Sequence, residues 1–563
     1  MWLNVARLLA WYAQMIYGMV VGYGRTQIVE RETPTLSSLP SEVLDEVASY
    51  LSRADLASLS LVDRSCSAIS RPHLWRTLPS LAPIITLLPR ECFAIDEFVM
   101  TKSEVRRGRM TYCSHERRTK IQYLRALDIQ NDCWKRNPRL LQSASHVQRL
   151  YLRLSQRSAT HSIYDRKGTI HIDLTNFIAF AESLAQCGTA STLFPNLRTL
   201  EVDCSSEDGL PARLLLPFTS PRLSVFSTNC LVSGMDDHPN WNHVTEFRFA
   251  EPRLEGRVLN SSVAEIPMFT AIQSRIRAVR TLDLCLHRAR GLHALLSQCS
   301  RTLCSLSLTI ASGRNKRVDS FALYHLRRLT LRGQSGAFAS ALLGSPHLQL
   351  VDVQPSLSRG ESDFTGIVDR IARGCRNDAL QRVRIVGKAR VVWSLAMHHI
   401  DPLTTFGNLV ELEVRASSHI ALGDADYDLL AQRLPRLHVF KVSDIDFAAA
   451  PREPPQRPAT LHALVSFATR CPDLRQLSLE IHEAETVPSL AEGLLAVTLP
   501  TKASQVDELG VGSGGKAISP ADVASFLRLL FPSLRHLKVS QCCDREAWNA
   551  VEKMVMAPKD AEH

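Results

Sequence analysis

A short apolar phrase returns along most of this chain and constrains the fold more than any other feature. Each copy has an apolar residue, two variable residues, a second apolar residue, one variable residue and a third apolar residue, as in Leu303-x-x-Leu306-x-Leu308. The alternation at its end is typical of a short strand with one buried face, and apolar residues at helical spacing fill many of the intervals. Because a unit of one strand and one helix leaves an apolar face uncovered, such units must stack on one another.

The copies resemble leucine-rich repeats of an irregular kind. Fifteen copies follow one another about 29 residues apart on average, where regular leucine-rich repeats take about 20–29 residues. They begin at Leu124, Val147, Leu197, Leu223, Val244, Val279, Leu303, Leu326, Leu348, Leu380, Leu409, Leu437, Leu474, Val506 and Leu534. The resemblance implies an α/β fold: a horseshoe-shaped solenoid over residues 121–545, whose concave sheet binds a protein target.

Length and composition agree with one long array. The 563 residues correspond to three or four compact domains at about 150 residues each, or to a single repeat array. With 45% apolar and 22% charged residues the chain is too apolar for global disorder, and its mean hydropathy of −0.05 excludes a multispanning membrane protein. The recurring phrase decides for the array.

Residues 36–90 have a different, strongly helical pattern. We expect a first helix that begins at Pro40, a second helix capped by Asp55, and a third helix that ends at Pro72. Three helices of this length bury little surface, so the rest of the chain or a partner must complete their apolar face.

The order and spacing of several residues in this module resemble the F-box family. The matching residues are Leu39-Pro40-x-Glu42-x-Leu44, Tyr50-Leu51, Asp55-Leu56, Leu59-Ser60-Leu61-Val62, Arg64 and Leu74-Trp75. The segment 76–83 that follows is similar to fungal F-box proteins. The resemblance implies a small helical F-box that docks a Skp-family adaptor, and through it a cullin, in a ubiquitin ligase.

The family's apolar docking and core positions fall on ten residues of this chain. They are Leu39, Pro40, Val43, Leu44, Val47, Leu51, Leu56, Val62, Leu74 and Trp75. The alternative is that these residues form only the core of a small helical domain, and one stripe can serve as both core and interface.

The flanking segments carry no motif for a membrane or nucleic-acid partner. Residues 1–35 form an apolar extension and linker, whose uncharged stretch 8–23 is shorter than the roughly 20 residues that span a bilayer. Residues 91–120 form a basic joint, and the segment 102–139 holds eleven Lys or Arg against four acids. Without a nucleic-acid reader motif, a solvated loop is the favoured interpretation. Residues 546–563 are predicted to be a C-terminal tail.

No segment contains a recognisable catalytic, metal or cofactor site. The run Gly510-x-x-x-x-Gly515-Lys516 lacks the Ser or Thr that holds magnesium in a phosphate loop, and the next helix is expected to begin only at 519–520. His398 and His399 are adjacent, and consecutive residues on a helix do not share a face. We therefore expect neither an enzyme nor a bound cofactor or metal.

The cysteines are interpreted as packing residues of a reduced, intracellular protein, cytoplasmic or nuclear. None of the 14 cysteines forms a C-x-x-C pair. Cys299, Cys375 and Cys471 precede phrase copies by three to five residues, where a small thiol fits the corner between helix and strand.

Together these features predict a substrate-recognition adaptor of a Skp–cullin–F-box ubiquitin ligase, whose repeats bind an unknown target protein. The alternative is a leucine-rich-repeat scaffold without a ligase role; nucleic-acid and membrane partners are not expected. Variable residues beside the strand apolars would line the target surface, and the arginines among them suggest an acidic or phosphorylated patch on the target. These residues are Arg328, Arg332, Arg382, Arg384, Glu411, Glu413, Lys441, Glu480, His536 and Lys538.

Overall fold

The computed structural model describes most of the chain in two compact units, one ending at Arg76 and one starting at Thr77. The described residues are 40–88, 93–101, 118–126, 137–155, 170–186, 193–204, 209–230, 232–233, 239–250, 278–287, 292–311, 323–333, 342–357, 360–389, 393–416, 419–444, 459–481, 504–512, 519–539 and 545–557. Among these residues, no helix has the length and apolar character needed to cross a bilayer.

The first unit consists of three short helices, α2 (Ser41–Tyr50), α3 (Arg53–Leu59) and α4 (Arg64–Arg76). Its buried residues are Leu44, Ala48, Leu56, Cys66 and Ser70. A link between helices joins His73 of α4 to Asp45 of α2, with 2.8 Å between Nε2 and Oδ1.

Three predicted helix boundaries in this unit are wrong. The first helix begins at Ser41, and Pro40 is its N-cap and not its first residue. The second helix is capped by Ser52, whose Oγ accepts the Asp55 backbone N–H (3.3 Å) and donates to the Asp55 carboxylate (2.6 Å). Asp55 therefore lies in the first turn, where its negative charge interacts favourably with the helix dipole. The third helix continues through Pro72 to Arg76, so this proline does not end it.

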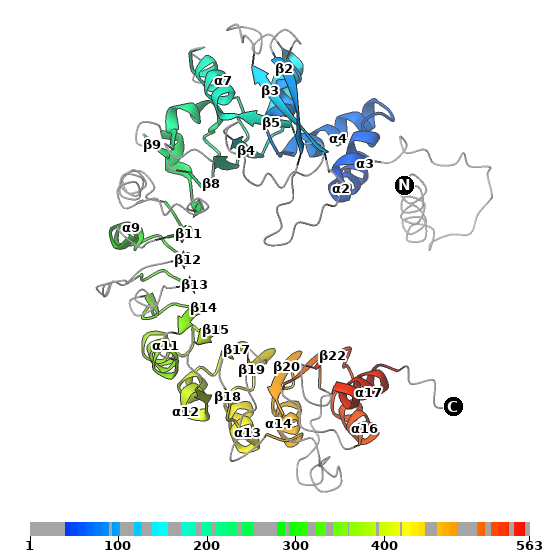
Figure 1. The fold of residues 1–563 in the computed structure, drawn as a ribbon, viewed down its shortest axis with the longest axis vertical. Helices are drawn as coiled ribbons and strands as arrows, with labels where there is room; N and C mark the ends of the chain where they lie inside the picture. Colours follow the sequence, from blue (N-terminus) through cyan, green and yellow to red (C-terminus); the bar gives the residue numbers. More distant parts are fainter. Residues whose placement is uncertain are drawn as a thin grey trace, which may run out of the picture. The chain divides into compact units, whose positions relative to one another are not determined.

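The second unit is built on one long sheet, shown in Figure 1. In the described part of the chain it has eighteen strands, and fifteen of them form a parallel ladder in chain order. The fifteen are β1 (Thr77–Leu78), β4 (Arg149–Ser155), β6 (Thr199–Cys204), β8 (Val225–Thr228), β10 (Glu246–Ala250), β11 (Thr281–Leu286), β12 (Ser305–Ile310), β13 (Arg328–Gly333), β14 (Leu350–Leu357), β15 (Arg382–Ala389), β17 (Glu411–Ala416), β19 (Val439–Asp444), β20 (Gln476–Glu480), β21 (Glu508–Gly512) and β22 (His536–Val539).

The recurring phrase sets the register of this ladder. The second apolar residue of one copy pairs with the same residue of the next, as Leu282 with Leu306, Leu306 with Leu329, and Leu329 with Val351. These four side chains are at most 1% exposed. The first apolar residue of each ladder copy lies just before its strand, at the corner that leads into it. The backbones of neighbouring corners are hydrogen-bonded to each other, as the Arg327 N–H donates to the Cys304 carbonyl at 2.8 Å. Each copy thus buries its apolar residues against the next.

Helices cover one face of the sheet and leave the other face open. In Figure 1 the labelled helices α9, α11, α12, α13, α14 and α16 lie on the same side of the strands that they connect. The α-helices of this unit are α5 (Ala82–Ile85), α6 (Pro138–Ser145), α7 (Leu174–Gln186), α9 (Leu292–Cys299), α11 (Glu361–Gly374), α12 (Met397–Ile400), α13 (Asp424–Arg433), α14 (His462–Arg470), α16 (Pro520–Leu530) and α17 (Arg545–Met556). The 3-10 turns are η3 (Ala212–Leu214), η4 (Leu216–Phe218), η6 (Pro239–His243) and η7 (Asp401–Thr405).

The predicted basic joint contains strands. An antiparallel pair, β2 (Phe93–Thr101) and β3 (Arg118–Ala126), spans it, and β3 also pairs in parallel with β5 (Ile170–Asp173), which joins β4. The prediction of a solvated loop is therefore wrong for 118–126, while 102–117 and 127–136 lie outside the described residues. The phrase copy at Leu124 is also an exception, because Leu124 lies within β3 and not before a ladder strand. Two small parallel pairs complete the strands: β7 (Leu210–Pro211) with β9 (Val232–Ser233), and β16 (Ser394–Leu395) with β18 (His419–Ile420).

The three selected cysteines lie at helix ends, as predicted. Cys299 is the last residue of α9, and Cys375 and Cys471 directly follow α11 and α14. All three are buried, and the Cys471 thiol lies 3.5 Å from the Leu434 carbonyl oxygen. Burial raises the pKa of Cys299 to about 11, and those of Cys375 and Cys471 to about 12. These thiols stay protonated at neutral pH and act as packing groups.

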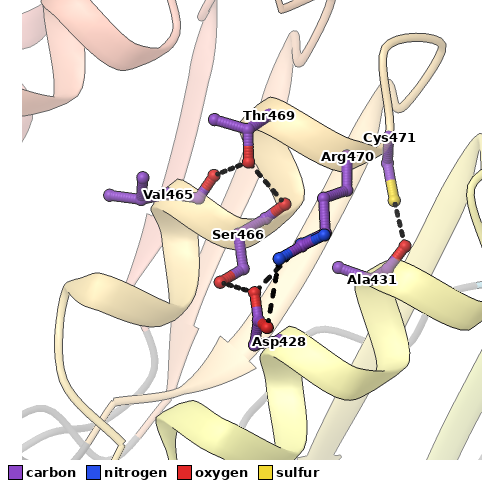
Figure 2. A network of polar contacts seen from close by, with 7 residues as sticks. All are labelled: Asp428, Ala431, Val465, Ser466, Thr469, Arg470 and Cys471. Carbon is purple, nitrogen blue, oxygen red and sulfur yellow. Dashed lines mark hydrogen bonds and ion pairs between the residues drawn. The ribbon is translucent and has the colours of Figure 1, made fainter. Parts of the chain in front are cut away.

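Neighbouring helices are also joined by polar contacts. Figure 2 shows Ser466 and Arg470 of α14 converging on Asp428 of α13. The Ser466 hydroxyl donates to Asp428 Oδ1 at 2.9 Å, and Arg470 contacts both carboxylate oxygens at 3.0 and 3.3 Å. Arg433 of α13 makes a similar link to Asp401 of η7, at 2.6 Å. Each link ties one helix to the element that precedes it along the ladder.

The segment predicted as a tail is largely helical. α17 occupies Arg545–Met556, and its Trp548 and Val551 are fully buried. Arg528 of α16 donates to carbonyl oxygens at the end of α17, including that of Ala557 at 2.9 Å. α17 therefore packs on the last helix of the ladder, and only 558–563 of the predicted tail lie outside the described residues.

Candidate functional site

The ten predicted docking positions of the helical unit separate into core and surface. Leu44 and Leu56 are 3% and 5% exposed, so they belong to the core of the unit. Pro40 and Val62 are exposed, whereas Leu39 lies outside the described residues. The other five positions are half-buried: Val43, Val47, Leu51, Leu74 and Trp75. The structure thus divides the predicted stripe into a buried part and a part that remains accessible.

Two exposed apolar side chains of the unit were not among the predicted docking residues. Leu61 is 86% exposed and Tyr50 is 80% exposed, beside 47% for Val62. Leu61 and Val62 lie in the turn after α3, and Tyr50 is the last residue of α2, where its hydroxyl donates to Glu46 at 2.8 Å. Tyr50 and Leu61 both lie in the segment that resembles the F-box family. The sequence signal that could have identified Leu61 is that it forms an apolar pair with Val62 directly after a helix end. These apolar side chains are accessible to a partner.

The predicted target-binding residues lie on strands of the ladder but differ in accessibility. Arg328, Arg332, Arg382, His536 and Lys538 are exposed. Arg384, Glu411 and Lys441 are half-buried, while Glu413 and Glu480 are buried.

Glu480 does not line the open face as predicted. It is only 3% exposed, because the alternation of β20 breaks at its end, where Leu479 and Glu480 are both buried. Its register partner is Gly512 on β21, and a Cβ at Gly512 would lie 2.5 Å from the Glu480 carboxyl group. The glycine thus leaves the space that this carboxyl group occupies.

The arginines of β15 and β17 are compensated by acids on the same strands. Glu413 is held between two guanidinium groups, with 3.0 Å to Arg384 Nε and 2.7 Å to Arg415 Nε. Arg384 also lies 4.0 Å from Asp352, and Arg382 lies 3.9 Å from Glu411. This part of the open face therefore carries little net charge for a ligand.

The lysines nearer the C-terminus share one acid. Lys538 Nζ lies 2.7 Å and Lys441 Nζ 3.8 Å from Glu508 Oε1. The hydrogen bond from Lys538, followed by the charges of both lysines, lowers the pKa of Glu508 and keeps it ionised. Lys441 and Lys538 are thus engaged within the sheet.

The histidine pair differs from its prediction. α12 is a single turn, and the rings of His398 and His399 lie in contact, with centroids 3.8 Å apart. Together with Glu361 they offer three ligand atoms within 4.8 Å of one another. However, His399 Nδ1 accepts the Ala396 N–H at 3.0 Å, so the neutral ring carries its proton on Nε2, 3.0 Å from the Glu361 carboxylate. A metal would need that Nε2 lone pair, so the arrangement fits a hydrogen bond better than a metal ligand.

The glycine-rich run is part of the sheet. Gly510 and Gly512 belong to β21, and α16 begins at Pro520 after Ser519, as predicted. Residues 513–518 lie outside the described residues. A Cβ at Gly510 would lie 2.6 Å from Ser478 Oγ, so packing against β20 accounts for this glycine.

One comparison with known proteins assigns part of the chain. The family model "F-box-like" matches residues 36–78, the segment that folds into α2, α3 and α4 and continues into β1. No curated protein matches the chain. The chain therefore carries an F-box-like domain at residues 36–78.

Proposed function

We propose that the chain is the substrate-recognition adaptor of a Skp–cullin–F-box ubiquitin ligase. The observation that carries the proposal is the F-box-like match, which coincides with a helical unit that leaves Tyr50, Leu61 and Val62 exposed. Apolar anchors of this kind supply most of the affinity when helices pack into a partner's groove. The partner is a Skp-family adaptor, which connects the chain to a cullin.

We further propose that the second unit is an irregular leucine-rich-repeat solenoid of the type found with fungal F-boxes, and that its open sheet face binds the target. The parallel ladder, in which fourteen of the fifteen strands follow a phrase copy, supports this assignment. The chain itself performs no chemistry. Other subunits transfer ubiquitin, and the chain raises the concentration of the target near them. The setting is reducing, cytoplasmic or nuclear, in keeping with the buried, protonated thiols of Cys299, Cys375 and Cys471.

Adaptor capture tests the ligase role. The wild-type chain should retain a Skp-family adaptor in a pull-down, and Leu61→Asp with Val62→Asp should abolish retention, because both side chains are exposed and a charge cannot enter an apolar groove. Leu44→Asp is unsuitable, since a charge at this buried position would unfold the unit.

Leu529→Asp is the matched control, because Leu529 is 58% exposed on α16 and lies outside the F-box-like domain. It should bind the adaptor like the wild type. Absence of binding by the wild-type chain would contradict the ligase role and leave the alternative, a repeat scaffold that binds proteins without a ligase.

A further inference from the structure

The open face of β12 and β13 carries exposed positive charge beside hydroxyl groups. Arg328, Thr330 and Arg332 of β13 alternate with the buried Leu329 and Leu331 and share the open face. Their register partners on β12 are Ser305, Ser307 and Thr309. We name these six residues the β12–β13 patch. It consists of two arginines and four hydroxyl groups.

The two arginines have no acidic partner among the residues that the structure describes, and both are exposed. On β14 the register partners of Arg328 and Arg332 are Leu350 and Gln354, neither of which is charged. The acid of that strand, Asp352, pairs with Thr330 in register and lies within 4.0 Å of Arg384. Unlike Arg382, Arg384 and Arg415, each of which lies beside a glutamate, Arg328 and Arg332 give β13 a positive charge that no described acid compensates.

The edge of the sheet adds to this charge. Arg280 and Arg327 are exposed at the corners that precede β11 and β13, and neither has an ion pair within the described part of the chain. The acid of β11 is Asp283, which lies in register with the hydroxyl residues Ser307 of β12 and Thr330 of β13. The rows that contain Arg328 and Arg332 thus remain without an acid from β11 to β14.

The spacing of the two arginines defines the shape of a ligand. They lie four residues apart on one strand, about 13 Å at roughly 3.3 Å per residue. An extended peptide along the strand has the same rise, so two of its side chains four residues apart can reach both guanidinium groups. Guanidinium binds carboxylate and phosphate with two parallel hydrogen bonds, and the hydroxyl groups between the arginines can donate to or accept from the peptide backbone.

We propose that the β12–β13 patch binds an extended segment of a protein target with two acidic side chains four residues apart. The inference rests on the proposed function insofar as it takes the ligand to be part of the target. The anionic groups can come from glutamate or aspartate, or from phosphorylated side chains. A nucleic acid fits less well, because the open faces of β11 to β14 present no aromatic ring for base stacking.

Peptide binding to the full-length chain tests the proposal. The probe is a fluorescent glycine–serine peptide with two glutamates four residues apart. Variants of this probe have two phosphoserines, two lysines, or glutamates two residues apart. We expect saturable binding of the glutamate or the phosphoserine probe, and the better of the two identifies the anion. The lysine probe should not bind, and the shorter spacing should weaken binding.

Arg328→Ala with Arg332→Ala should reduce the affinity at least about tenfold, because each arginine contributes a charged hydrogen bond. Arg370→Ala with Arg373→Ala is the matched control, since it removes two exposed arginines from α11 on the helical face. Equal binding by the first double variant, binding of neither anionic probe, or preference for an oligonucleotide over both probes would overturn the proposal.

Thermal unfolding of both double variants checks that they fold, and adaptor capture should be unchanged in both. The two proposals can therefore fail separately. Peptide binding without adaptor capture would contradict the ligase role alone, and adaptor capture without peptide binding would contradict the patch alone.

Discussion

Arg470 forms a two-pronged ion pair with Asp428, which lies 42 residues earlier in the chain and one helix back along the ladder. The pair is partly exposed, with 43% of each side chain accessible, but its two contacts and the Ser466 hydroxyl fix the geometry. It connects α13 and α14 on the face opposite the open sheet.

Removing this pair should weaken the interface between α13 and α14. We expect Arg470→Ala to lower the free energy of unfolding by about 0.5–1 kcal/mol, measured by urea titration, since well-formed but exposed ion pairs are worth this much. A double-mutant cycle with Asp428→Ala should give a coupling energy of the same size. Arg373→Ala, which removes a 3.6 Å ion pair and a hydrogen bond to Asp369 within the one helix α11, should cost less. Equal losses in the free energy of unfolding would show that the ion pair between α13 and α14 contributes no more to stability than a pair within one helix.

Substitution of a buried apolar residue of the ladder should lower the stability of the protein far more than substitution of an exposed residue in the same copy. Leu329→Ala removes a fully buried side chain from the register row and should destabilise the protein by about 2–5 kcal/mol. Tyr324→Ala, at a position 62% exposed, should change the stability by no more than about 0.5 kcal/mol. Thermal and urea unfolding compare the two variants, and a mild effect of Leu329→Ala would argue against close packing of β13.

Gly512 should not tolerate a side chain. Gly512→Ala places a methyl group 2.5 Å from the Glu480 carboxyl group, so we expect a loss of about 1–3 kcal/mol. Gly344→Ala is the control, because a Cβ there meets no atom within 4 Å. Glu480→Ala combined with Gly512→Ala should recover part of the loss. If it recovers none, the clash with Glu480 is not the cause.

The buried thiols should make stability depend on alkaline pH. The pKa of Cys471 is about 12 in the folded chain against an ordinary 9.0, so the folded state keeps the proton that the unfolded state releases. The contribution is present below pH 9 and is lost as the pH rises from 9 toward 12. Unfolding of Cys471→Ala between pH 8 and 10 should show a shallower decline than that of the wild type. In the native protein, iodoacetamide at pH 8 should leave Cys375 and Cys471 unmodified, as mass spectrometry can verify.

The ladder could be predicted because its signal is local. Each phrase copy contains its own strand alternation, so even the weak copies at Leu223 and Val244 precede β8 and β10. The antiparallel pairing of β2 with β3 was not predicted even though a phrase copy lies at Leu124, because the basic residues of this segment favoured a solvated loop. The cap at Ser52 was missed because Asp55 is an equally good capping residue by type, and only the backbone geometry distinguishes them.

The residues that form the candidate surfaces were less predictable, because their roles depend on distant neighbours. The burial of Glu480 depends on a glycine 32 positions later, and the neutralisation of Arg384 depends on Glu413 of the next strand. In the F-box-like domain, the periodicity identified one apolar stripe. It could not separate Leu44, which is buried in the unit, from Val62, which remains exposed.

The chain-order ladder has a consequence for how such a protein can change over generations. Because each ladder strand from β6 to β21 pairs with the strands of the preceding and following copies, duplication or loss of one whole copy requires only that two new neighbours fit. A new copy inserted after β13 would alter the surroundings of the two free arginines, yet every register elsewhere in the sheet would persist. Recognition can therefore diversify copy by copy while the F-box-like domain stays the same.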